Sequence, residues 1–232
     1  MLEAHIIKRR HEIAIDVSLI VKPGEAVGMF GASGAGKSTL LACIAGIEEP
    51  EGGYVRLDGV SFFPPPLELY KRPIGYLTQD AGLFPHLTVG GNVCFGISGP
   101  QKEYVNWIAE LRDRLHLGPI WDVSARSISG GQARRVALAR TLARKPKILL
   151  LDEPFAGLDR RLVRELIDAL SDSRAALGFG MIAVDHDAEV LKRLCPAQAI
   201  VLEQGRVVQT GTWKELCTAP ATPLLRSLLA PL

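Results

Sequence analysis

Residues 31–39 constrain the fold of this chain more than any other stretch. They read GASGAGKST and match the pattern G-x-x-x-x-G-K-[ST]. An apolar segment ending at Phe30 precedes them and helix-forming residues follow, which is the context that this pattern requires. Its glycines let backbone N–H groups and the start of the helix face phosphate oxygens. The stretch therefore predicts a strand, a phosphate-binding loop and a helix, in preference to an ordinary glycine-rich turn.

Two side chains of this loop carry specific chemistry. Lys37 can bridge β- and γ-phosphate oxygens, and the Ser38 hydroxyl can bind Mg²⁺. A purine preference does not follow from the loop alone. The residues predicted to contact a bound nucleotide here are Gly31, Ala32, Ser33, Gly34, Ala35, Gly36, Lys37, Ser38 and Thr39.

A second chemical signal stands at residues 148–154, which read ILLLDEP. This is a buried apolar strand that ends in two acids, and a parallel sheet presents reactive groups at its carboxyl edge. Asp152 is predicted to hold Mg²⁺, directly or through water, and Glu153 to act as the general base that polarises the attacking water. Taken alone, paired acids after a strand more often cap a helix. The phosphate loop in the same chain reverses that preference.

Hydrophobic periodicity predicts an α/β fold with a mainly parallel sheet, an N-terminal antiparallel β subdomain and an inserted α-helical subdomain. Residues 1–82 and 146–232 are expected to form the core with its β subdomain, and residues 83–145 the helical insert. The expected strands cover residues 2–8, 13–21, 25–30, 54–57, 74–78, 148–151, 181–184, 199–202 and 206–208. The expected helices cover residues 37–46, 101–117, 131–144, 160–177 and 187–194, with a short one after the capping box at 212–215.

The charge balance argues against a nucleic-acid partner. The formal net charge is only +2. Basic residues late in a helix also complement its dipole and solvate its outer face, which is the reading we prefer for the one basic cluster. Its members are Arg134, Arg135, Arg140, Arg144, Lys145 and Lys147.

Cysteine usage and hydropathy indicate the compartment. The 4 cysteines form no CxxC pair and have no histidine spacing suited to zinc, which favours a reducing compartment. No apolar run approaches the ~18 residues that a membrane span needs. Any membrane association is therefore expected to be peripheral.

The order of three motifs produces a family resemblance. Residues 128–132 read ISGGQ, which resembles the signature LSGGQ with Ile for Leu, and they lie between the phosphate loop and the acid strand. With these motifs the chain resembles the nucleotide-binding subunit of an ATP-binding cassette (ABC) transporter. The resemblance covers about residues 1–220 and is greatest to importer ATPases of the molybdate, sulfate and iron group. It identifies the expected core as an ABC-type P-loop NTPase that uses ATP and Mg²⁺.

The resemblance implies that the signature is half of a binding site. A serine hydroxyl, bare glycine N–H groups and a helix N-terminus together make a second cradle for a γ-phosphate. Two copies would pair head to tail, so that each ATP lies between the lysine loop of one copy and the signature of the other. The residues assigned to this cradle are Ser129, Gly130, Gly131 and Gln132.

Three further positions match family motifs. Gln79 resembles the Q-loop glutamine, which can touch Mg²⁺ or the attacking water. Asp159 closes a D-loop that reads FAGLD and crosses the dimer seam. His186 resembles the switch histidine, which can hydrogen-bond the γ-phosphate. Alone, Gln79 would more often be an ordinary surface residue, and His186 a structural one.

One position departs from the family pattern. Relatives normally have an aromatic ring in the N-terminal strands on which adenine stacks, and residues 7–13 contain none. Arg10 or His11 could lay a planar group over the base instead, since cations and imidazoles also stack on π-systems. We therefore expect looser discrimination between bases.

The resemblance also implies partners. Residues 80–98 are expected to receive transmembrane permease subunits, and a periplasmic or extracellular solute-binding protein would act indirectly. The expected location is the cytoplasmic face of the cell membrane, with molybdate or a related oxyanion as the imported solute. Two alternatives stay open: a non-transport ABC-type ATPase acting on DNA or ribosomes, and a P-loop kinase.

Overall fold

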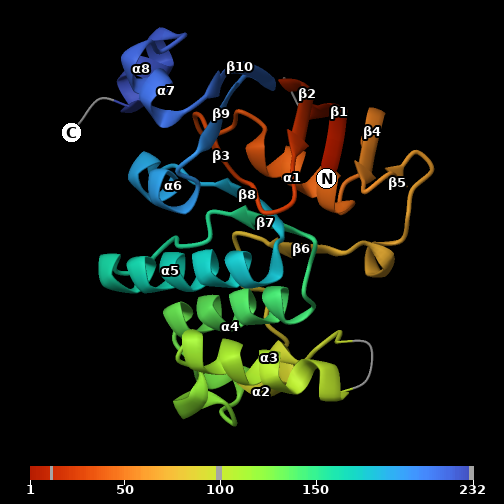
Figure 1. Ribbon diagram of the computed structural model, residues 1–232, viewed down its shortest axis with the longest axis vertical. Helices are drawn as coiled ribbons and strands as arrows, with labels where there is room; N and C mark the ends of the chain where they lie inside the picture. The colour runs from red at the N-terminus through yellow and green to blue at the C-terminus, as the bar shows by residue number, and fades with distance from the viewer. Residues whose placement is uncertain (11–12, 98–100, 230–232) are drawn as a thin grey trace.

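The computed structural model describes residues 1–10, 13–97 and 101–229, without the side chains of residues 101–103. Two β-sheets and a set of helices are stacked along the long axis of the molecule (Figure 1). The N-terminus and the last described helix, α8 (Pro223–Leu229), lie in the half that carries the sheets.

The first sheet is antiparallel and is built mostly from the N-terminal strands. Strand β1 (Leu2–Arg10) lies between β2 (Ile13–Val21) and β4 (Gly52–Leu57), and β5 (Val60–Phe63) pairs with the free edge of β4. Every second residue of β2 from Ile15 onward is buried, as a strand with one solvated face requires. The predicted N-terminal antiparallel β subdomain is confirmed.

The second sheet is mainly parallel and forms the centre of the molecule. Its order is β10 (Arg206–Gly211), β9 (Gln198–Glu203), β3 (Ala26–Phe30), β8 (Gly180–Val184), β7 (Ile148–Asp152) and β6 (Ile74–Leu77). Only β10 runs antiparallel to its neighbour. All residues of β3, β7 and β8 are buried, because both faces of the sheet are covered.

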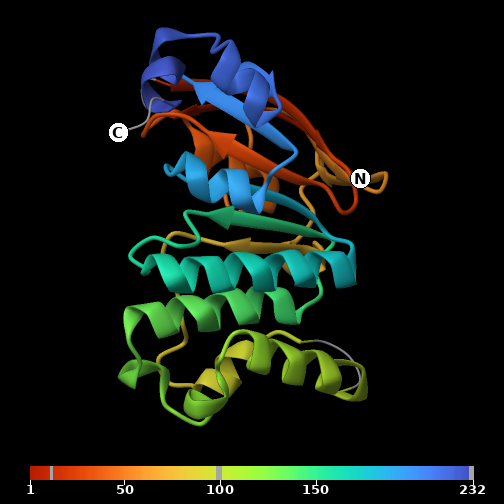
Figure 2. The same cartoon turned by 60° about the vertical axis from the view of Figure 1, so that its left-hand side comes forward.

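Helices and the first sheet cover the two faces. Helix α1 (Lys37–Ala45) and the antiparallel sheet share one apolar core with one face of the central strands. The other face packs against α4 (Gly130–Ala143), α5 (Arg160–Leu177) and α6 (Ala188–Leu194). Figure 2 shows α4 and α5 side by side beneath the central strands. The predicted α/β fold is confirmed.

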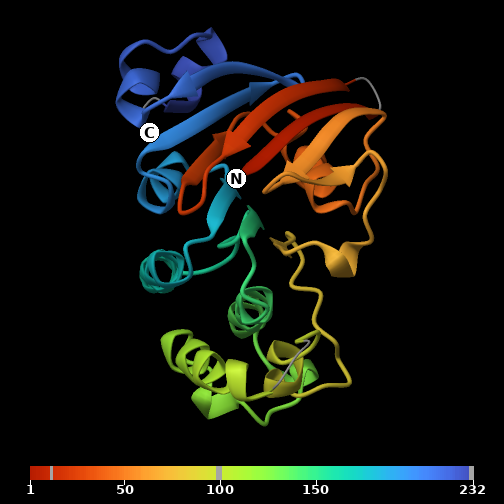
Figure 3. The ribbon, with the colours of Figure 1, turned by 45° about the vertical axis from the view of Figure 1, so that its right-hand side comes forward.

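A helical group occupies the end of the molecule opposite the antiparallel sheet. It contains α2 (Val89–Val93), α3 (Gln101–Arg114) and α4, which lie together in both views (Figures 1 and 3). The indole N–H of Trp107 donates to the Leu142 carbonyl at 3.0 Å and so joins α3 to α4. The signature sequence thus begins a helix that connects this group to the central sheet.

Several element predictions needed correction. The helix expected over 101–117 ends at Arg114, since His116 has a φ of 50° and a 3₁₀ turn follows at Gly118–Ile120. Strand β5, helix α2 and helix α8 (Pro223–Leu229) were not predicted. The capping box before α7 (Trp213–Thr218) is confirmed, with Thr212 and Glu215 bonding each other's backbone. No helix in the described ranges has the length and apolarity to cross a bilayer.

Candidate active site

The phosphate loop leaves the C-terminal end of β3 and opens α1. Gly31 adopts a φ of 149°, and a Cβ there would lie 2.1 Å from the Leu202 carbonyl oxygen, so the backbone of β9 excludes any side chain. Gly36 has a φ of 98° in the left-handed region and immediately precedes α1. Both positions require glycine, and together they turn the loop so that Lys37 begins the helix.

Lys37 lies inside the loop. Its ammonium group donates to the carbonyls of Gly31 and Ala32, each at 2.8 Å, and the residue is 9% exposed. Burial lowers the pKa of Lys37, and the charges of Glu153 and Asp152 act in the opposite direction. An ammonium has three N–H donors. One donor is therefore left for a phosphate oxygen while the other two brace the loop.

A cavity of about 650 Å³ opens over this loop. Ligand pockets in proteins typically have ~300–1,000 Å³. The lining combines the loop with Arg10 and two isoleucines of β2, and with the ends of β6 and β7: Arg10, Ile13, Ile15, Ser33, Gly34, Gly36, Lys37, Ser38, Thr39, Gln79 and Glu153. The structure therefore brings Gln79 and Glu153, predicted from distant motifs, to the phosphate loop.

The predicted Mg²⁺ residues face each other across the ends of β7 and α1. The Ser38 hydroxyl donates to Asp152 Oδ1 at 3.0 Å, and the Tyr76 hydroxyl donates to Asp152 Oδ2 at 3.5 Å. Oxygen ligands suit Mg²⁺, which keeps several waters or phosphate oxygens of its own. Within the described part of the chain no group of 3 or more His, Cys, Asp or Glu side chains could hold a metal ion. The oxygens of Ser38 and Asp152 are of the ligand type that Mg²⁺ prefers, and the cavity beside them can admit a phosphate oxygen as a further ligand.

Tyr76 was missed by the sequence reasoning. Burial and the charge of Asp152 raise the pKa of its phenol, so the hydroxyl remains a proton donor to the carboxylate. Its position within β6 marks it as a sheet residue, and nothing local shows that its hydroxyl reaches the neighbouring strand.

Asp152 leads to a prediction about pH and stability. Burial raises the pKa of this carboxyl, against the opposing hydrogen bond from Ser38. The folded protein then binds the Asp152 proton more tightly than the unfolded chain does. Proton binding therefore stabilises the folded protein fully below the unfolded-state pKa of Asp152, and this stabilisation is lost as the pH rises through the folded-state pKa. We expect Asp152→Asn to exceed the wild type in free energy of unfolding at about pH 8, with the advantage disappearing towards about pH 4.

Urea denaturation of the protein without Mg²⁺ or nucleotide, repeated across this pH range, measures the effect. Asp168→Asn on α5 is the matched control, because it makes the same substitution at an exposed carboxylate. An Asp152→Asn variant that is less stable than the wild type at the upper end of the range would contradict the prediction.

Glu153 follows directly in a constrained turn. Its φ of 46° is in the left-handed region, which costs a non-glycine residue free energy, and its N–H donates to the Val184 carbonyl at 2.9 Å. The side chain is 28% exposed, and its Oε2 accepts from the Gln79 amide at 3.3 Å. Neither Asp152 nor Glu153 caps a helix. The turn instead directs one carboxylate to Ser38 and the other into the cavity.

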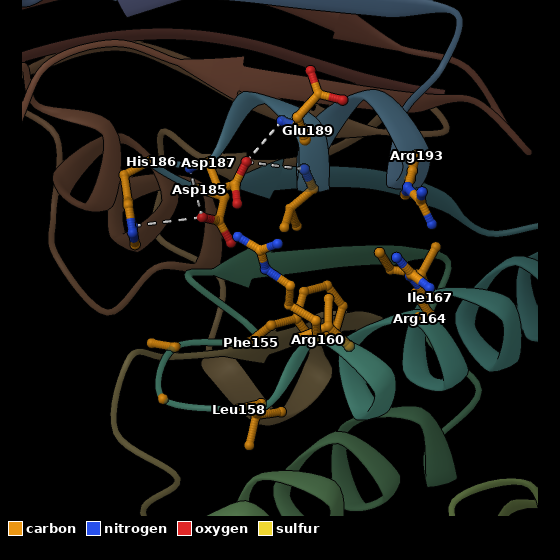
Figure 4. Close-up of a pocket in the computed structure, with 14 residues that line it drawn as sticks. Phe155, Leu158, Arg160, Arg164, Ile167, Asp185, His186, Asp187, Glu189 and Arg193 are labelled. Atoms are coloured by element: carbon orange, nitrogen blue, oxygen red, sulfur yellow. Dashed lines mark hydrogen bonds and ion pairs between the residues drawn. The ribbon is translucent and has the colours of Figure 1, made fainter. Parts of the chain in front are cut away.

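His186 lies at the next strand end, beyond β8. Its Nδ1 is 3.8 Å from Glu153 Oε1 and 3.5 Å from Asp185 Oδ1, and the side chain is 74% exposed. The imidazole is at the edge of a second cavity, of about 510 Å³, next to Asp185 (Figure 4). This cavity lies between the segment after Glu153 and the start of α6, so His186 belongs to its wall and touches the first cavity only through Glu153.

The signature residues form the start of α4. Ser129 is the helix N-cap: its hydroxyl accepts from the Gln132 N–H at 3.3 Å, and the Gln132 side chain accepts from the Ser129 N–H at 2.8 Å. Ser129 and Gly130 are exposed, and a Cβ at Gly130 would have no neighbour within 4 Å. None of residues 129–132 lines either cavity. The structure therefore does not bring the signature to the phosphate loop of the same chain.

The D-loop and adenine positions have ordinary local roles in the structure. Asp159 caps α5, its Oδ1 accepting from the N–H groups of Arg161 and Leu162, each at 3.0 Å. Arg10 lines the first cavity, where its guanidinium donates to the Thr39 hydroxyl at 3.2 Å and pairs with Glu48.

The other proposed adenine contact, His11, lies outside the described residues.

The cavity also has an apolar lining that the sequence did not predict, from Ile13 and Ile15 of β2. Their place in the alternation of residues 13–21 marked them as strand residues, with no sign that they border the phosphate loop.

The fold and the first cavity define a class before any comparison is made. In this mainly parallel sheet, β3 leads into a glycine loop that holds the buried Lys37, and β7 ends in Asp152, which is bonded to Ser38. This combination defines a P-loop nucleoside triphosphatase. The family model described as "ABC transporter" matches residues 15–156, and the chain belongs to that family. The predicted ABC ATPase core is confirmed.

Relatives and solved structures agree with this assignment. The chain is 40% identical over 232 residues to "Methionine import ATP-binding protein MetN" of Thermobifida fusca (strain YX), covering 97% of this chain and 72% of that protein. It is 39% identical over 219 residues to "Probable sulfate/thiosulfate import ATP-binding protein CysA" of Chlorella vulgaris, covering 92% and 90%. A solved structure described as a dimeric post-hydrolysis state of the ATP-binding cassette MJ0796 bound to ADP and Pi matches with a TM-score of 0.79 at 27% identity, covering 91% of this chain and 98% of that one.

Proposed function

We propose that this chain is the ATP-hydrolysing subunit of an ABC importer. The observation that carries the proposal is the convergence of three ends at one cavity: the lysine loop after β3, Gln79 after β6 and Glu153 after β7. The parallel strands deliver these groups to the same edge of the sheet, where such folds bind their ligands. The similar proteins named for the import of methionine and sulfate support a role in import.

The proposed reaction is hydrolysis of ATP to ADP and phosphate. Lys37 and the loop amides hold the β- and γ-phosphates, and Gln79 and His186 orient the attacking water. Glu153 takes the proton from that water. A Mg²⁺ held by Ser38, Asp152 and Gln79 would neutralise charge on the phosphate oxygens.

The exposed signature suggests how the chain acts on partners. Ser129, Gly130 and Gly131 lie outside the cavities of their own chain, so we propose that they bind the γ-phosphate of ATP held by a second copy. Gln132 completes the capping box of α4 beside them. Asp159 would lie at the interface between the two copies. Two ATP molecules would then close a head-to-tail dimer. The similar solved structure is described as dimeric, which supports the pairing of two copies.

We propose that residues 80–98 transmit the closing movement of the ATP-bound dimer to the permease subunits. Phe84 and Phe95 of this segment pack with their ring centroids 4.1 Å apart, and Phe95 is 49% exposed, which leaves apolar surface for a docked helix. We propose that residues 83–145 move as a helical subdomain against a core of residues 1–82 and 146–232. The complex would lie on the cytoplasmic face of the membrane and receive solute from an external binding protein.

The imported solute is proposed only as a class. The sulfate-named relative favours an oxyanion such as molybdate or sulfate, while the methionine-named relative is equally similar, so identity does not choose between them. The solute would contact the permease and the binding protein, not this chain.

Phosphate release from ATP by the purified protein, with Mg²⁺ and no added acceptor, tests the proposal. We expect turnover by the wild type and none by Lys37→Ala, which loses the cation that contacts the phosphates. Affinity purification from membranes should also recover an integral membrane protein. Transfer of phosphate to an acceptor without hydrolysis would favour a kinase instead, and recovery of DNA or ribosomes in place of a permease would favour a non-transport ATPase.

A further inference from the structure

Arg134 is the most highly coordinated side chain near the candidate active site. It lies on α4, in the turn after the signature, and is 5% exposed. A guanidinium has five N–H donors, and all of them are used here. The acceptors are all backbone carbonyls: Nε donates to Pro154 at 2.7 Å, Nη1 to Thr78 at 2.7 Å and Gln79 at 2.6 Å, and Nη2 to Asp152 at 3.1 Å and to Glu153.

These carbonyls lie at two strand ends. Thr78 and Gln79 follow β6, while Asp152 is the last residue of β7 and Glu153 and Pro154 form the turn after it. The two side chains meet at 3.3 Å in the first cavity. Arg134 therefore holds the main chain of both residues whose side chains meet in the first cavity.

The position of Arg134 corrects the interpretation of the basic cluster. A solvated outer face was expected for these residues, but Arg134 is buried and Arg135 donates inward to the carbonyls of Leu115 and His116 at 3.0 and 3.1 Å. Burial lowers the pKa of the Arg134 guanidinium, opposed by nearby acids of which Asp152 is the first. Burying a cation is costly unless every donor is satisfied. The five bonds meet that condition, and they exist only while the two turns keep their present shape.

We propose that Arg134 is a positioning residue for hydrolysis, tying the turns of Gln79 and Glu153 to each other and to the helix that begins at Ser129. The inference rests on the proposed function and goes beyond it. The N-terminal end of α4 is where the partner's nucleotide would bind. The Arg134 guanidinium couples a movement of this end to the Gln79 amide and the Glu153 carboxylate. Its bonds to Asp152, Glu153 and Pro154 also maintain the left-handed backbone of Glu153.

Arg134→Lys tests the proposal. A lysine has three donors on one nitrogen and cannot span acceptors in two turns. We expect kcat at saturating ATP to fall between about ten- and a hundredfold, because small misplacements of catalytic groups have effects of that size. The dissociation constant for ATP, measured by displacement of a fluorescent nucleotide, should stay within about threefold, since no acceptor of Arg134 belongs to residues 31–39. A kcat within about twofold of the wild type, or parallel losses of kcat and ATP affinity, would overturn it.

Arg135→Lys is the matched control. It makes the same substitution one residue along the same helix, where the guanidinium donates to the segment after α3. Its kcat should remain within about twofold of the wild type. An equal loss of kcat in both variants would show a general effect on α4 and contradict a specific role for Arg134.

Hydrogen exchange separates this inference from the proposed function. The Glu153 amide donates to the Val184 carbonyl, so its exchange reports on the turn without any need for hydrolysis. We expect exchange at Glu153 to be at least about tenfold faster in Arg134→Lys and unchanged in Arg135→Lys. A wild type that releases no phosphate would refute the proposed function alone, whereas unchanged exchange in Arg134→Lys would refute the positioning role.

Discussion

Glu153→Gln is expected to stop ATP hydrolysis and to leave a nucleotide-dependent dimer. The amide matches the carboxylate in shape but cannot accept the proton of the attacking water, and a general base contributes roughly 10²–10⁴ to the rate. Lys37 and the glycine loop are untouched, so ATP should still bind. Phosphate release measures the first effect, and gel filtration with and without Mg²⁺ and ATP measures the second. A variant that remains monomeric with ATP would count heavily against the shared site.

The control for this variant is Glu165→Gln. Glu165 lies on α5, where it pairs with Arg161 at 3.0 Å on the surface, and its neutralisation removes one carboxylate far from the loop residues. Surface pairs contribute little to stability, about 0–1 kcal/mol. Its turnover should equal that of the wild type, and it should show no dimer beyond that of the wild type.

Ser129→Arg is expected to abolish turnover while the isolated subunit still binds ATP. The substitution places a long side chain on an exposed helix N-terminus that lies outside both cavities of its own chain. It also removes the N-cap of α4, which costs about 1 kcal/mol and should not unfold the protein. Titration with a fluorescent ATP analogue and a phosphate-release assay separate the two effects. Loss of nucleotide binding by the monomeric variant would contradict the division of labour between loop and signature.

A mixing experiment sharpens this test. A dimer of one Lys37→Ala copy and one Ser129→Arg copy contains one intact loop facing one intact signature, although each variant alone has none. We expect phosphate release to reappear on mixing. A chain carrying both substitutions, mixed with an inactive Lys37→Ala copy, offers no intact pair and should remain inactive.

The chemistry of this protein was predictable where the relevant residues are adjacent in sequence. Short sequence motifs were enough to predict the loop at 31–39, the acids at the end of β7 and the signature at the start of α4. One turn or one strand end sets the geometry of each. The partners of those groups were not predictable. The pair of Arg10 with Glu48 and the bond from Tyr76 to Asp152 join residues that are 38 and 76 positions apart.

Arg134 shows why a cluster of basic residues alone misleads at such a site. Basic residues late in a helix are typical of a solvated face. The placement of α4 against two strand ends instead makes Arg134 a buried donor. Helix α2 was missed for a different reason. Its five residues include Gly90 and Gly91, which weaken an isolated helix, and packing against Trp121 and α4 stabilises it instead.

A structure of Glu153→Gln trapped with ATP and Mg²⁺ tests the central claim most directly. The account predicts that Ser129 Oγ and the Gly131 N–H lie at hydrogen-bond distance, about 2.7–3.2 Å, from γ-phosphate oxygens of an ATP held by Lys37 of the other copy. A complex in which every ATP contacts a single chain, with residues 129–131 facing solvent, would contradict it.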